Sequence, residues 1–162
     1  MLLPLILICA SCASGDPEVA RFRVVNCFRE EARAEEALQV ARAAVPVVLA
    51  RLGLLSWSPD GPKTLHLYAD FARFRGATAA LNPDAPEAQG YTNRDSRTAH
   101  VTVVPGAETL GALGLSNQTR RLIAHEVTHL VCFDLLPDMT SLPGWMVEGL
   151  ADSVAHEVVC TL

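Results

Sequence analysis

A pentapeptide with two histidines and a glutamate, His125-Glu126-Val127-Thr128-His129, carries the clearest chemistry in this chain. Histidines four residues apart lie about one turn from each other on one face of a helix, so both imidazoles can face one metal ion. The glutamate lies beside that face, where its carboxylate can act as a base on a water held by the metal. The opposite arc of the helix is apolar and suited to burial, with Ile123, Val127, Leu130 and Val131.

Two histidines leave such a site incomplete, because a catalytic zinc takes three protein ligands and keeps one position for water. Glu148 stands nineteen residues after His129, in a segment expected to form a second helix, and is the candidate third ligand. Asp152 lies one turn beyond Glu148 on the same face. Its carboxylate can accept the outer N–H of a ligand histidine, which would fix the tautomer of that ring.

The pentapeptide, followed by Trp145-Met146-Val147-Glu148-Gly149-Leu150-Ala151, resembles the gluzincin zinc metallopeptidases, specifically the compact peptidase MA-like domains. The resemblance is specific over residues 117–157. It implies one Zn²⁺ held by His125, His129 and Glu148, with Glu126 as the general base in the hydrolysis of a peptide or protein substrate.

The same resemblance implies a zincin-like fold, in which an edge strand lies over the active-site cleft and pairs with extended substrate. Residues 99–104 are the candidate for that strand. The ligand set leaves no vacancy for Cys132, three residues after His129, so this cysteine is expected to be a packed thiol. The family usually supplies a further donor to the oxyanion from a His or Tyr beyond the third ligand. His156 is the only such residue in that stretch, and Tyr91 is an alternative.

The elements that must position these residues follow from hydrophobic spacing and turn signals. They predict one α+β domain over residues 22–162, with a small mixed sheet packed on the motif helix and on the third-ligand helix that follows it. The expected strands are 22–28, 64–68 and 98–104, and the expected helices are 30–52, 70–80, 116–133 and 143–159. Pro46 is expected to kink or split the first helix, and Gly53 to end it. Trp57 and Trp145 are expected to anchor the core.

The first residues form an apolar leader. Its run from Leu2 to Ala10 is too short for a membrane span, which needs about 20 residues, and suits a signal peptide. Residues 1–12 resemble a bacterial lipoprotein signal with Cys12 as the lipidated residue, followed by a tether over 13–21. Cleavage after Ala13 by an ordinary signal peptidase is the alternative. The prediction is an exported protein of the periplasm or cell surface that touches the membrane only through a lipid anchor.

Composition limits the remaining function classes. Half of the 162 residues are hydrophobic and 19% are charged, which excludes a wholly disordered chain. A net charge of −5 without basic clusters argues against nucleic acid as a partner.

Three cysteines remain outside the leader: Cys27, Cys132 and Cys160. Two of them can pair in an oxidising compartment, but the sequence does not say which, and three buried thiols are an equal alternative.

Two other functions stay open at this stage. The chain can be an exported zincin-like module that binds a polypeptide without cutting it, or it can hydrolyse a non-peptide amide. Only fourteen residues follow Glu148, so we expect either a minimal peptidase or a fragment truncated at its C-terminus. Substrate preference and oligomeric state are not predicted.

Overall fold

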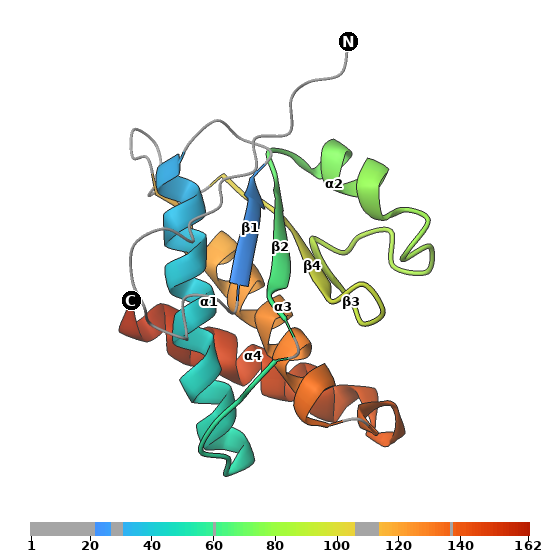
Figure 1. Ribbon diagram of the computed structural model, residues 1–162. Helices are drawn as coiled ribbons and strands as arrows, with labels where there is room; N and C mark the ends of the chain where they lie inside the picture. The colour runs from blue at the N-terminus through green and yellow to red at the C-terminus, as the bar shows by residue number, and fades with distance from the viewer. Residues whose placement is uncertain (1–21, 27–30, 60, 106–113, 137) are drawn as a thin grey trace.

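The computed structural model describes residues 22–26, 31–59, 61–105, 114–136 and 138–162. The described chain forms an α+β fold with a small mixed sheet of four strands and four α-helices (Figure 1). In chain order the elements are β1 (Phe22–Asn26), α1 (Glu31–Leu52), β2 (Lys63–Tyr68), α2 (Phe71–Thr78), β3 (Gly90–Asn93), β4 (Thr98–Thr102), α3 (Asn117–Leu135), the short 3₁₀ helix η3 (Met139–Ser141) and α4 (Gly144–Thr161). The predicted α+β class is therefore confirmed, and so is the mixed character of the sheet.

The strands lie in the order β1-β2-β4-β3, with β1, β2 and β4 parallel and β3 antiparallel to β4. The prediction that residues 99–104 form the edge strand is wrong, because β4 is hydrogen-bonded on both sides. The edge beside the motif helix belongs to β3, in a segment that lies outside the strands and helices we expected. A hairpin explains the difference, since residues 94–97 turn the chain back so that Gly90–Asn93 pairs with β4.

The core lies between the sheet and helices α1 and α3. Alternate strand residues point into it, and Val24, Leu65 and Ala99 form one cross-strand row that is buried to 3% exposure or less. Small residues of α1 allow the helix to approach closely, and its buried side chains are Ala34, Ala37, Leu38, Val40, Ala41, Ala44, Val45, Val48 and Leu49. The helix continues past Pro46 without being split, and Gly53, with φ of +68°, ends it as predicted.

Polar contacts at both ends of α3 fix the position of the motif helix. At its start, Ser116 caps the helix, since its side chain accepts a hydrogen bond from the Thr119 N–H. The same hydroxyl donates to the carbonyl of Val104 at 2.6 Å, which ties the start of α3 to the end of β4. Near the end of the helix, Asp134 accepts hydrogen bonds from the buried Lys63 ammonium at 2.7 Å and the Trp57 indole N–H at 3.1 Å.

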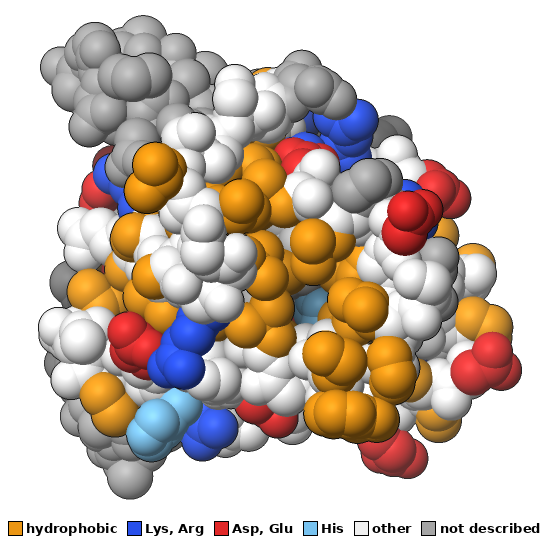
Figure 2. Space-filling view, turned by 90° about the horizontal axis from the view of Figure 1, so that it is seen from below, with side chains coloured by type: hydrophobic (Ala, Val, Ile, Leu, Met, Phe, Trp, Pro, Cys, Tyr) orange, Lys and Arg blue, Asp and Glu red, His pale blue; other side chains and the backbone are white. Residues whose placement is uncertain are grey.

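The two tryptophans differ in environment. Trp57 is 2% exposed and lies in the core, as predicted, but Trp145 is 75% exposed, so the prediction that it anchors the core is wrong. Trp145 stands in the first turn of α4 on a face that no described element covers. Leu142 and Met146 beside it are also exposed. Figure 2 shows hydrophobic side chains gathered toward the right of the face seen from below, where α3 ends and α4 begins in Figure 1.

Several expectations concern residues that the structure does not describe. The signal peptide over 1–12 with Cys12, the tether over 13–21, and Cys27 all lie outside the described residues. Cys132 is a buried free thiol, as expected of a packed cysteine, and burial raises its pKa to about 11. Cys160 is free and exposed. Among the described residues, none of the helices combines the length and apolar character needed to cross a membrane.

Candidate metal centre

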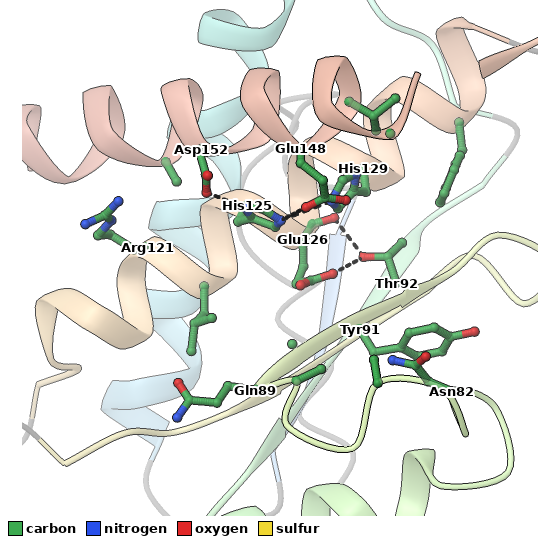
Figure 3. A pocket seen from close by; sticks show the side chains of 18 of the residues that line it. Asn82, Gln89, Tyr91, Thr92, Arg121, His125, Glu126, His129, Glu148 and Asp152 are labelled. Atoms are coloured by element: carbon green, nitrogen blue, oxygen red, sulfur yellow. Dashed lines mark hydrogen bonds and ion pairs between the residues drawn. The ribbon is translucent and has the colours of Figure 1, made fainter. Parts of the chain in front are cut away.

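Three of the predicted site residues converge on one point between α3 and α4. The Nε2 atoms of His125 and His129 lie 3.1 Å apart. Glu148 reaches from α4 toward both rings, with Oε2 at 3.1 Å from the His125 Nε2 and Oε1 at 3.5 Å from the His129 Nε2. Figure 3 shows the three side chains pointing toward one another from the two helices.

Asp152 orients one of the two imidazoles. Its Oδ1 lies 3.0 Å from the Nδ1 of His125. Because an ionised carboxylate only accepts, the ring donates its Nδ1 proton to Asp152, and this contact turns Nε2 toward Glu148. The position of Asp152 one turn after Glu148 on α4 explains how one helix supplies both carboxylates.

The His125-His129-Glu148 group can hold a metal ion, and all its ligand atoms lie within 4.8 Å of one another. A tetrahedral centre with metal–ligand bonds of about 2.0–2.2 Å separates its ligands by about 3.3–3.6 Å, close to the distances found here. The chemistry of the donors agrees with this geometry, since two imidazole nitrogens and a carboxylate oxygen face one another. A divalent cation between them would be held by all three.

Burial supports the neutral form of one ligand. His129 is 9% exposed, and burial, followed by the proximity of His125, lowers its pKa to about 4. A neutral ring keeps a lone pair free for a metal ion. The Glu148 side chain is 60% exposed, so the centre is closed by protein on the α3 side and open on the α4 side.

Glu126 lies in the same cleft, held against the edge strand β3. Its Oε2 accepts a hydrogen bond of 2.6 Å from the Thr92 hydroxyl, whose oxygen is also 3.1 Å from the Glu126 carbonyl oxygen. Gly90 leaves the room that the carboxylate fills, because a Cβ at that position would lie 2.9 Å from the Glu126 Cδ. Burial raises the pKa of Glu126 to about 7, although the Thr92 hydrogen bond and His125 act in the opposite direction.

The register of the sheet explains why Thr92 meets the base. Thr92 pairs with Ala99, whose side chain faces the core and α3, whereas Tyr91 pairs with His100 on the opposite face. The Tyr91 ring lies 6.3 Å from the His100 ring, and Figure 3 shows it turned away from the metal-binding histidines. The structure thus does not bring the Tyr91 hydroxyl to the centre, although the residue borders the cleft.

His156, the other expected oxyanion donor, is also separate from the centre. It is exposed on α4, is absent from the cleft lining, and has its Nε2 3.9 Å from the Sγ of Cys160. Thr92 and Gly90, in contrast, lie against the expected base but were not predicted, since the segment that carries them lies outside the expected strands and helices.

The cleft around these residues has a volume of about 1120 Å³. It runs along α3, with β3 on one side and α4 on the other (Figure 3). Asn117 and Arg121 line one end and Phe133 lines the other. These residues span sixteen positions of the helix, or about 24 Å, the length of roughly seven residues of extended peptide.

Comparisons with protein-family models, with curated proteins and with solved structures found no match for this chain.

Proposed function

We propose that this protein is a zinc-dependent metallopeptidase of the gluzincin type. The observation that carries the proposal is the convergence of His125, His129 and Glu148 on one point, with Glu126 in the same cleft. Two imidazoles and one carboxylate are a typical ligand set of catalytic zinc, which keeps a further position for water. A zincin-like fold is part of the proposal, supported by the motif helix, the ligand helix after it and the antiparallel edge strand beside it.

The chain's own residues have distinct tasks in this reaction. Zinc, when bound, supplies a Lewis acid that acidifies water and polarises the scissile carbonyl. Glu126 accepts the proton of the attacking water at its carboxylate and delivers it to the leaving amine. Thr92 and Gly90 hold that carboxylate in place from β3, and Asp152 holds His125 in the tautomer that presents Nε2.

The length and openness of the cleft favour a polypeptide substrate. About 24 Å of groove beside a sheet edge fits an extended chain better than a compact small molecule. We further propose that the protein acts after export, in the periplasm or at the surface of a bacterial cell, held by a lipid on Cys12. The support for this last part is the leader sequence alone.

A polypeptide-binding module without catalysis is the second candidate. The observation that favours it is the placement of Tyr91 and His156, neither of which lies with the three ligands. Without a donor for the oxyanion, a peptide would bind in the cleft with little turnover.

The experiment that decides between the two candidates combines zinc content with a peptidase assay, on the wild type and on Glu126→Gln. For the peptidase we expect one zinc per chain in both proteins and cleavage by the wild type alone. Zinc without cleavage in either protein would favour the binding module. No zinc in the wild type would contradict both.

A further inference from the structure

The cleft is chemically asymmetric along α3. Beyond His129 its walls are apolar and come from three elements: the last turns of α3, the η3 segment and the first turn of α4. Their lining side chains are Phe133, Met139, Leu142 and Val147. The Phe133 ring continues directly from the centre, with its centroid 6.3 Å from that of His129. An apolar compartment therefore begins one helical turn from the metal ligands.

The opposite end of the cleft is polar. Asn117, Gln118 and Arg121 line it from the first turns of α3, and Gln118 donates a hydrogen bond of 3.0 Å to Gln89 across the groove. This half also contains the apolar lining residues Leu122 and Ala155, but its polar side chains have no counterpart among Phe133, Met139, Leu142 and Val147, so the two halves of an extended ligand meet different surfaces.

Trp145 directly follows Gly144, which lines the cleft, although Trp145 is not itself a lining residue. It stands three residues before Glu148 on α4 and so lies about 60° from it around the helix, next to the face that borders the cleft. The side chain is 75% exposed, and Leu142, which does line the cleft, is 38% exposed. An exposed tryptophan next in sequence to residues that line an apolar cleft wall is typical of a binding surface. Figure 2 shows the hydrophobic side chains of this region at the surface.

Charge argues for a peptide rather than a membrane as the occupant. Residues 138–162 contain no Lys or Arg, Glu148 lines the cleft, and one guanidinium, that of Arg94, lies 5.9 Å from the Phe133 ring centroid. A surface that docks on anionic lipid headgroups uses basic residues at such positions.

We propose that this apolar end is the specificity site of the cleft and binds a bulky apolar side chain of an extended peptide substrate. Phe133 and Leu142 contact the bound side chain, and Trp145 covers it from the rim. This inference rests on the proposed peptidase function and adds the substrate class: polypeptides with a phenylalanine- or leucine-like residue on the His129 side of the scissile bond.

The test uses tryptophan fluorescence, because the chain has two tryptophans and only Trp145 is open to solvent. The full-length Glu126→Gln variant is titrated with alanine heptapeptides that carry Phe, Ala or Asp at the central position. We expect the Phe peptide to shift the Trp145 emission to shorter wavelength, to reduce its quenching by acrylamide, and to bind at least tenfold more tightly than the other two. Equal binding of the three peptides, or unchanged quenching of Trp145, would overturn the proposal.

Two variants and a vesicle titration sharpen the test. Leu142→Ala should weaken binding of the Phe peptide about tenfold, whereas Leu55→Ala, which removes a fully exposed leucine that does not line the cleft, should leave it unchanged. The vesicles consist of phosphatidylcholine and phosphatidylglycerol. If they protect Trp145 from acrylamide quenching and the Phe peptide does not, the surface binds a membrane and the proposal is overturned.

The outcome is separable from that of the peptidase assay, because the fluorescence needs neither turnover nor zinc. Protection of Trp145 by the Phe peptide in a protein that cleaves nothing would support the binding site and refute only the peptidase. Cleavage of all three peptides at equal rates, with Trp145 unprotected, would refute only the specificity site.

Discussion

Gly90 offers a way to displace the proposed base without touching a metal ligand. The residue lies in β3, where its hydrogen leaves space for the carboxylate of Glu126. In the variant Gly90→Ala, the new methyl group would occupy part of that space. We expect Glu126 to move away from Thr92, while His125 and His129, on the adjoining face of α3, keep their positions.

The size of the effect follows from the contact distances. The added Cβ would lie 2.9 Å from the Cδ and 3.0 Å from the Cγ of Glu126, whereas ordinary contact begins at 3.4 Å. The Oε1 atom of Glu126 lies closer still to the added Cβ, so the carboxylate must shift by more than about 0.5 Å or rotate out of its hydrogen bond. Since a misplacement of about 1 Å can cost about 100-fold in rate, we expect kcat to fall about 10- to 100-fold, or about 1.4–2.8 kcal/mol.

The assay measures kcat and KM on a fluorogenic peptide, together with zinc content and melting temperature. Gly76→Ala is the matched control, because a Cβ at Gly76 in α2 meets nothing within 4 Å. We expect Gly90→Ala to lower kcat with little change in KM and with one zinc still bound, and Gly76→Ala to behave as the wild type. Adding Gly90→Ala to Glu126→Gln should cause no further loss, because both changes act on the same group.

A wild-type kcat in Gly90→Ala would refute this reasoning, since it would mean that the position of Glu126 against β3 does not matter. Loss of zinc from the same variant would refute it as well, because the methyl group would then act on the metal centre rather than on the base.

Three further predictions concern the surroundings of the centre. Asp152→Asn should weaken zinc binding about 10- to 100-fold, measured by competition with a chelator, because the partner that orients His125 is altered; unchanged affinity would contradict the role. Burial lowers the pKa of His100 to about 4, whereas the same histidine in the unfolded chain has a pKa of 6.5. Between these pH values the unfolded chain binds a proton that the folded chain does not, so the free energy of unfolding should fall as the pH is lowered from 6.5 to 4. Urea titrations should show a shallower fall in His100→Gln, and an equally steep one would count against this assignment. Lys63→Ala leaves the partly buried carboxylate of Asp134 without its ammonium partner, and we expect it to lower the free energy of unfolding by about 3 kcal/mol, measured by urea titration. A decrease of less than about 1 kcal/mol would contradict this prediction.

Much of the fold could be predicted because its signals are local. Ser116 caps α3, Gly53 ends α1, and the helical spacing of apolar residues places α1, α3 and α4 within two or three residues of their observed ends. The convergence of His125, His129 and Glu148 was also predictable, since the first two share one helix face and the third follows on the next helix.

The edge strand was missed for a physical reason. A strand of four residues with no buried side chain has no hydrophobic alternation to show, and its stability comes from pairing with β4. One signal was available: Tyr91 and Thr92 have high strand propensity and precede a turn in which the Asn93 side chain accepts a hydrogen bond from the Ser96 N–H. Recognising that hairpin would have identified β3 as the edge strand and Thr92 as a neighbour of α3.

The exposure of Trp145 could not be derived from residue type, because tryptophan is usually packed and burial depends on which element covers the face. The face of α4 that carries Trp145 has no described partner, whereas Trp57 is enclosed by the core and donates to Asp134. The position of Tyr91 depends on register in the same way, because a shift of one residue would have turned its ring toward the motif helix.

X-ray absorption spectroscopy of the zinc-loaded chain identifies the ligands of the metal without requiring a substrate. We expect two imidazole nitrogens at about 2.0–2.1 Å and oxygen ligands at about 2.0–2.2 Å, with one oxygen lost in Glu148→Ala. A sulfur ligand at about 2.3 Å would contradict this ligand set, and Cys132, three residues after His129, is the cysteine that would supply it. A spectrum without imidazole would contradict it as well.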